Sequence, residues 1–148
     1  MSKYLPLVAR VLLGAMFVFS GSNGFFHYVT LPPPGGDAGA LFAGFAAAGY
    51  MLPLIFGTQL LGGLLVLSGR LTPVGLVLLA PVLVNIDLFH LVLVPKGLGT
   101  GLFLTAVELY LAYAYRAAFQ PMFASVSTEP ALAGRATRSD PSGALPTA

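Results

Sequence analysis

Three polar residues stand close together in one of the most apolar runs of the chain. Asn85, Asp87 and His90 all lie in "NIDLFHLVLVP" (85–95). A carboxylate in membrane hydrocarbon costs at least ~2.5 kcal/mol on insertion scales, so it needs a partner, a water-filled cavity or a function. Asp87 and His90 are three residues apart and can touch on one helix face. Asn85 lies about 200° around the helix from Asp87 and should face a different neighbour.

Other apolar runs carry polar residues at a similar depth. Counted from the run ends at about 1.5 Å per residue, Gln59 and Glu108 lie roughly 15 Å down, near the membrane midplane. Charged groups in a helix bundle face its interior or a water-filled cavity. We therefore predict one polar ligand-binding pocket that opens to the outside of the membrane, lined by Asn23, Gln59, Asp87, His90 and Glu108.

These residue types suit proton relay or ligand binding, because a buried carboxyl group beside a histidine can hold a proton near neutral pH. Structural roles are the alternative. Gln59 and Asn85 would then be hydrogen bonds between helices, Asp87 and Glu108 buried ion pairs or protonated groups, and His90 a rim residue. The spacing does not favour a metal site. Because the chain has no cysteine, a redox role would need a cofactor or a partner, and no catalytic residue can be assigned.

The composition indicates which elements position these residues. Of 148 residues, 57% are hydrophobic and only 8% are charged, whereas soluble domains carry roughly a quarter charged residues. Four apolar runs reach the ~20 residues that cross a bilayer as a helix. We predict an all-α integral membrane four-helix bundle over residues 1–118, with spans at about 5–27, 50–69, 71–94 and 98–118. The net charge of +2 does not indicate nucleic-acid binding.

Two segments lie outside the predicted spans. Between the first two spans, "DAGALFAGFAAAG" (37–49) is apolar but too short to cross a membrane, so we predict a short interfacial helix whose first turn Asp37 caps. After the fourth span, residues 119–148 are small, polar and proline-bearing. Such a segment cannot bury enough apolar surface to fold alone, which predicts a disordered cytoplasmic tail.

Positive charges predict the orientation, because lysine and arginine in short flanks stay cytoplasmic. With both termini inside, only Lys96 is outside, and the cytoplasmic charges are Lys3, Arg10, Arg70, Arg116, Arg135 and Arg138. The interfacial helix is then external. A signal peptide is the alternative for the first run, but that run continues to Phe26 and is long enough for a full span.

Small residues four apart let helix backbones approach closely in membranes. Thr58 and Gly62 have this spacing in the second span. Gly97, Gly101 and Thr105 have it at the start of the fourth. We expect both stripes to face neighbouring helices.

Four stretches resemble the DoxX family of small four-span membrane proteins. They are "ARVLLGAMFVFSGSNGF", "GTQLLGGLLVLSGRLTPVGLVLLA", "NIDLFH" and "VELYLAY", and together they cover about residues 8–115. Relatives often place glutamate where Gln59 stands, so this chain lacks that charge. The resemblance implies a multi-pass protein of the bacterial inner (plasma) membrane. It also implies a link to quinone-dependent oxidation of sulfur compounds or to complexes that handle oxidative stress.

The residues and the resemblance together predict a membrane subunit of a redox-linked system. It would bind a small ligand, such as a quinone headgroup, in the polar pocket, and a redox partner protein would supply the electron chemistry. We do not predict a stand-alone enzyme; if catalytic, the chain would be an oxidoreductase subunit. The alternatives are a non-enzymatic scaffold or assembly factor that holds partners through its tight helix faces, and a proton-coupled transporter, which would need to form a homo-oligomer.

Overall fold

The computed structural model describes residues 4–30 and 32–123, and these residues fold into helices. Four helices are long and apolar enough to cross a membrane. They are α1 (Leu5–Phe26), α3 (Met51–Ser68), α4 (Thr72–Val92) and α5 (Leu98–Ala114), the last preceded by the short 3-10 helix η1 (Pro95–Gly97). The predicted all-α class with four spans is therefore confirmed. The orientation in the membrane stays a prediction from the charges.

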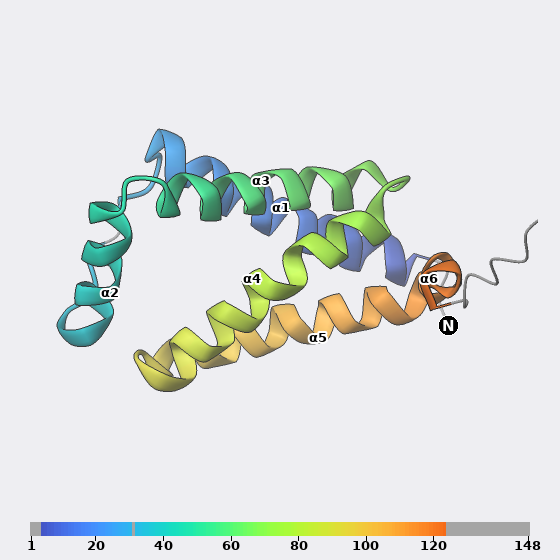
Figure 1. Cartoon of the computed structure of the whole chain (residues 1–148). Helices are drawn as coiled ribbons and strands as arrows, with labels where there is room; N and C mark the ends of the chain where they lie inside the picture. The colour runs from blue at the N-terminus through green and yellow to red at the C-terminus, as the bar shows by residue number, and fades with distance from the viewer. Residues whose placement is uncertain (1–3, 31, 124–148) are drawn as a thin grey trace, which may run out of the picture.

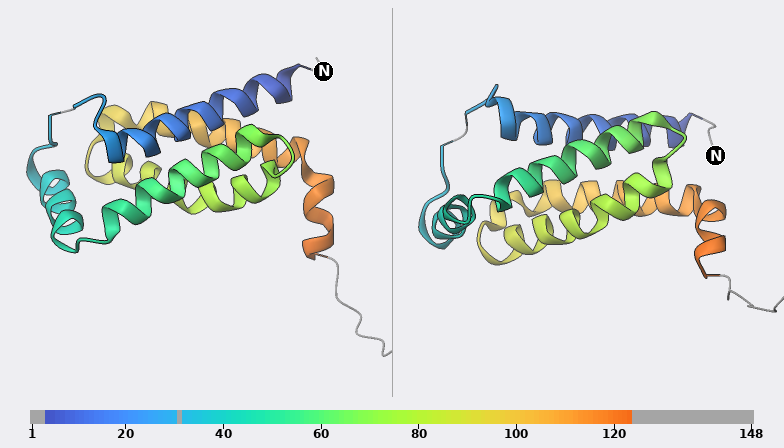
Figure 2. Two further views of the ribbon diagram at one scale, coloured as in Figure 1. Left: turned by 90° about the horizontal axis from the view of Figure 1, so that it is seen from above. Right: turned by 45° about the horizontal axis from the view of Figure 1, so that its top comes forward.

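The four long helices form two antiparallel pairs (Figures 1 and 2). α1 packs along α3, α4 packs along α5, and the α3–α4 hairpin joins the pairs. The short helix α2 (Gly36–Ala47) stands across one end of the bundle, and α6 (Arg116–Phe123) and the N-terminus lie at the other end. α3 and α4 diverge from their hairpin toward α2 (Figure 1).

The backbones of α1 and α3 touch because glycines line their contact. A Cβ added at Gly21 would lie 2.5 Å from the Leu60 backbone nitrogen, and one added at Gly63 would lie 2.7 Å from the Val18 backbone nitrogen. Lipid tails are as apolar as leucine, so helices in a membrane associate through such close packing. The glycines therefore set the distance between α1 and α3.

The glycine before Gly63 on α3 contacts the other neighbouring helix, α4. Gly62 faces α4, where a Cβ would lie 2.6 Å from the Leu79 side chain, and a Cβ at Gly75 would lie 2.8 Å from the Gly62 carbonyl oxygen. Adjacent residues point about 100° apart on a helix, so Gly62 and Gly63 can meet two different helices. This agrees with the close packing expected for Gly62.

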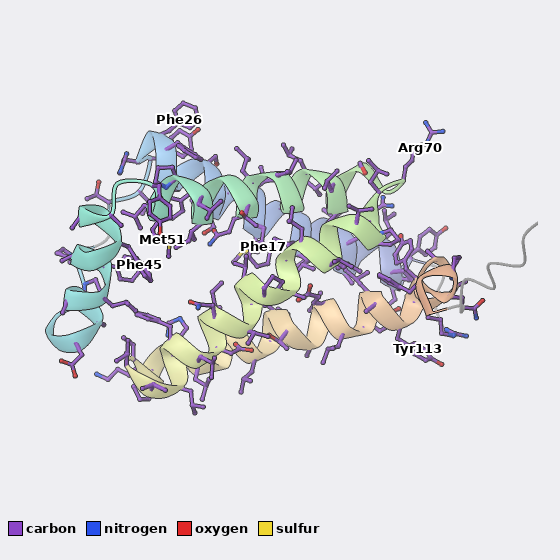
Figure 3. All side chains as sticks on the ribbon, viewed as in Figure 1. Phe17, Phe26, Phe45, Met51, Arg70 and Tyr113 are labelled. Atoms are coloured by element: carbon purple, nitrogen blue, oxygen red, sulfur yellow. The ribbon has the colours of Figure 1, made fainter. Side chains whose placement is uncertain are left out.

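The α3–α4 hairpin is fixed by polar contacts at its turn. Thr72, which is fully buried, donates its hydroxyl to the Val66 carbonyl at 3.2 Å. Gly69 ends α3 with a left-handed backbone (φ 76°), and the Arg10 guanidinium lies directly against it. Gly69 and Thr72 therefore build the turn between α3 and α4. Apolar side chains fill the centre, including Phe17 (Figure 3), Leu13, Leu79, Leu83 and Leu111.

The short helix α2 begins one residue earlier than predicted, and Asp37 does not cap it. Gly35, with an extended backbone, precedes the first helical residue Gly36, and no side chain makes a capping hydrogen bond. Asp37 lies inside the first turn, where its side chain cannot occupy the capping position. α2 is held over the bundle end by an edge-to-face ring contact between Phe42 and Phe89 of α4, with centroids 5.7 Å apart.

The fourth span is shorter than predicted, because α5 ends at Ala114 rather than near residue 118. The Arg116 side chain stacks on the Tyr113 ring at 4.4 Å and donates to the Tyr113 carbonyl, so it satisfies a carbonyl that the ended helix leaves free. Residues 119–123 belong to α6 and are helical, which the predicted tail did not anticipate. The rest of that tail, 124–148, lies outside the described residues.

Replacing Gly63 with alanine should destabilise the bundle, because the new Cβ would press on the Val18 backbone. Overpacking of this kind costs about 1–3 kcal/mol. We expect Gly63→Ala to lower the thermal unfolding midpoint in detergent micelles. Gly57→Ala is the matched control, since a Cβ at Gly57 of the same helix meets nothing within 4 Å. Equal midpoints for the two variants would contradict the backbone contact.

Candidate functional site

The space between α3 and α4 forms an apolar groove beneath α2. It has a volume of about 270 Å³, and α2, α3 and α4 all contribute to its walls. Its lining includes Phe45, Met51, Thr58, Gln59, Pro81 and Asn85. Phe45 and Met51 mark its α2 end in Figure 3. We call this space the amide groove, because Gln59 and Asn85 bring two primary amides to it.

A hydrogen bond orients the Gln59 amide. The Ser20 hydroxyl of α1 donates to Gln59 Oε1 at 2.7 Å, and the Gln59 side chain is only 6% exposed. The amide oxygen is therefore occupied. The Nε2 amino group, which makes no hydrogen bond to a described residue, remains as a donor at the groove wall.

Asn85 faces the same groove from α4. Its side chain is exposed and makes no hydrogen bond to any described residue. An amide that leaves water without a partner is costly, by roughly 1–3 kcal/mol on protein mutational data. As predicted, Asn85 and Asp87 face different neighbours, because Asn85 points to the α3 side and Asp87 to the α5 side.

Asp87 is bound within the α4–α5 contact. Its Oδ2 accepts a hydrogen bond from the Thr105 hydroxyl at 2.6 Å, while its Oδ1 is buried without a partner. Gly101 lies directly against Oδ1, where a Cβ would collide with it. The small-residue stripe of α5 therefore makes room for a polar side chain of α4.

His90 makes no hydrogen bond or ion pair with Asp87, although the two can share one helix face. The His90 ring has its Nδ1 at 3.2 Å from the Val94 carbonyl oxygen and lies directly against Gly97. Each of the two side chains meets a different part of the segment that follows α4. The spacing of three residues places them near one another on the helix, but their hydrogen bonds go to Val94 and to Thr105.

Glu108 lies in a second cavity, between α4 and α5, which we call the carboxyl cavity. The cavity has a volume of about 230 Å³. Thr105 and Glu108 are its polar lining residues, and the apolar ones include Ala80, Leu83, Val84 and Leu109. Glu108 is 6% exposed, makes no hydrogen bond or ion pair with a described residue, and has its Oε1 fully buried.

Asn23 stabilises the chain that leaves α1. Its Nδ2 donates to the Val29 carbonyl at 3.1 Å, and its Oδ1 accepts from the Val29 backbone N–H at 2.8 Å. Between them, His27 takes a left-handed backbone (φ 54°). Both ends of the Asn23 amide are therefore occupied by the loop.

The two described spaces hold different members of the predicted pocket. Gln59 lines the amide groove, Glu108 lines the carboxyl cavity on the opposite side of α4, and neither space includes Asn23, Asp87 or His90. Equal depth in the membrane does not fix the direction in which each side chain points, so depth alone does not bring Gln59 and Glu108 to one space. Asn85, omitted from the predicted pocket, lies four residues after Pro81 and shares its helix face. No group of three acidic or histidine side chains that could hold a metal ion occurs among residues 4–30 and 32–123.

Replacing Gly101 with alanine should push the Asp87 carboxylate away from Thr105. We expect the unfolding free energy in mixed micelles to fall, and to fall less for Gly99→Ala, because a Cβ at Gly99 meets nothing within 4 Å. Thr105→Val should then cost less in the Gly101→Ala background than alone, by up to about 1.7 kcal/mol for a hydrogen bond between membrane helices. If the two substitutions changed the unfolding free energy additively, the contact of Gly101 with the Asp87–Thr105 pair would be contradicted.

The DoxX family model matches residues 5–91, which include α1, α2, α3 and nearly all of α4. Neither the curated proteins nor the solved structures contain a match to the chain. The family match includes every residue that lines the amide groove. Because it extends over more than half of the chain, this multi-pass membrane protein belongs to the DoxX family.

Proposed function

We propose that this protein is a membrane subunit of a quinone-linked redox system and that it binds the quinone headgroup in the amide groove. The observation that carries the proposal is the pair of primary amides, Gln59 and Asn85, in an otherwise mostly apolar groove between membrane-spanning helices. Small-molecule sites commonly combine apolar walls with a few placed polar groups.

The chemistry of a quinone matches these two amides. A quinone ring is flat and apolar, and its two carbonyl oxygens accept hydrogen bonds. Gln59 offers a donor of fixed orientation, because Ser20 holds its oxygen. Asn85 offers both a donor and an acceptor, since its amide has no partner among the described residues. Asn85 can therefore bond to a carbonyl of the quinone and, after reduction, to the hydroxyl of the quinol.

The size of the groove fits a headgroup rather than a whole lipid-soluble quinone. Its volume of about 270 Å³ is just below the roughly 300–1,000 Å³ typical of ligand pockets. Exposed apolar residues such as Leu54 line the groove. The long tail of a membrane quinone would therefore run along them into the hydrocarbon.

Electron transfer to or from the quinone requires a partner protein. The chain has no cysteine, so it cannot exchange electrons through a thiol–disulfide couple of its own. In this proposal the chain binds and orients the quinone, and the partner provides the other redox centre. The charge distribution predicts that the α2 end, and with it the groove, lies nearer the external face of a bacterial-type plasma membrane.

The scaffold alternative has less support. It depends on small-residue helix faces that are free to hold other proteins. Gly62 packs against Leu79, and Gly101 packs against Asp87, so these faces are used inside the chain. The unpartnered Asn85 amide favours ligand binding instead.

Removing either amide should weaken quinone binding. Gln59→Leu and Asn85→Leu should each raise the dissociation constant of decylubiquinone about two- to tenfold, since one net hydrogen bond is worth roughly 0.5–1.5 kcal/mol. Binding is measured as the quinone retained on captured nanodiscs that contain the protein.

Gln120→Leu is the matched control, because it makes the same chemical change at an exposed position of α6. This variant should bind like the wild-type protein. A Gln59→Leu, Asn85→Leu double variant that binds decylubiquinone as tightly as the wild type would overturn the proposal.

A further inference from the structure

We propose that the carboxyl cavity is a second ligand site, which takes a membrane-soluble amine and holds its ammonium group on Glu108. The site lies on the opposite side of α4 from the amide groove. It therefore stands independently of the proposed quinone function.

The anchor of this site is a buried acid without a partner. Glu108 is more than nine-tenths buried and makes no hydrogen bond or ion pair with a described residue. A carboxyl group in a mostly apolar surrounding must be neutralised by a proton or paired with a cation. The described residues do not supply that cation, which leaves room for one from a ligand.

Glu108 is the one charged residue among the described residues that line the cavity, and α6 contributes the apolar Phe119. The α4 residues of the cavity, including Ala80, Leu83 and Val84, are apolar. On α1, the charged residue Arg10 lies against Gly69 at the α3 terminus and forms no ion pair. On α5, Thr105 is polar, but its hydroxyl donates to Asp87. Asp87, which accepts that hydrogen bond, carries the wrong charge to balance Glu108.

The mouth of the cavity selects molecules that dissolve in hydrocarbon. Val77, Val84 and Leu109 line it and are each more than half exposed on the outer surface of a membrane-spanning hairpin. A ligand therefore enters from the lipid. The volume of about 230 Å³ admits an aromatic ring with a short chain but not a peptide. An apolar body with one basic nitrogen meets both requirements.

A single proton transfer would complete the binding. The amine crosses the hydrocarbon in its neutral form, and its nitrogen takes the proton from the Glu108 carboxyl group. One O–H bond breaks, one N–H bond forms, and the product is an ammonium–carboxylate pair inside the cavity. No other reactant is needed, and the net charge of the complex does not change.

The test uses the full-length protein in nanodiscs of zwitterionic lipid and tritiated phenylbutylamine as the probe. We expect saturable binding at one site per chain, weakened at least tenfold by Glu108→Gln. Asp37→Asn is the matched control, because it makes the same acid-to-amide change on an exposed residue of α2. It should bind the probe like the wild type. Phenylbutanol, which has a similar shape but no basic nitrogen, and decylubiquinone should both fail to displace the amine.

A second measurement covers the case in which Glu108→Gln does not fold. Dicyclohexylcarbodiimide reacts with carboxyl groups from within the membrane, and peptide mass spectrometry should locate its adduct on Glu108 of the wild-type protein. Phenylbutylamine should slow that labelling. Equal amine binding by wild type and Glu108→Gln, or labelling that the amine leaves unchanged, would overturn the second site without affecting the quinone proposal.

Discussion

The contact of the α3 backbone with two neighbouring helices determines the shape of this bundle. Gly63 meets the α1 backbone and Gly62 meets α4, so α3 is held closely on two sides within a single helical turn. In a membrane no hydrophobic force drives helices together, and close packing takes its place. Because the α3–α4 contact is tight near the hairpin and ends before α2, the two helices separate at that end. The amide groove occupies the space that this separation creates.

The periodicity of α4 divides the polar residues into two groups. Pro81 and Asn85 lie on the side that faces α3, while Ala80, Val84 and Asp87 lie on the side that faces α5. A helix turns by about 100° per residue, so neighbours in the sequence reach opposite surfaces. Neutral amides therefore gather on one side of α4 and carboxyl groups on the other. On the second side, Asp87 joins α4 to α5 by accepting a hydrogen bond from Thr105.

Much of this architecture follows from the sequence, because span length and glycine spacing depend on local rules. The four spans, the close packing of Gly62 and the opposite directions of Asn85 and Asp87 are all present in the structure. The partners of the polar side chains could not be predicted in the same way. Counting residues gives the depth of Gln59 and Glu108, but the rotation of each helix about its axis depends on packing with helices distant in sequence. Depth alone therefore does not show that Gln59 lines the amide groove and Glu108 lines the carboxyl cavity.

Whether a ligand binds in the amide groove or in the carboxyl cavity depends on the hydrogen-bond donors and acceptors of each space, and not on the route by which the ligand enters. Both spaces lie between membrane-spanning helices and have apolar walls, so ligands for either must first dissolve in hydrocarbon. At the Gln59 wall, Ser20 holds the amide oxygen and leaves an N–H donor, which suits a carbonyl ligand and disfavours an ammonium. Once the amine has taken its proton, Glu108 is a carboxylate that offers only acceptors, which suits the ammonium group. Specificity is a difference in affinity between two ligands. A ligand that leaves polar groups of the site without hydrogen-bond partners binds more weakly, which contributes to that difference. One serine–glutamine hydrogen bond and one unpaired acid would thus favour different ligand classes in the two spaces.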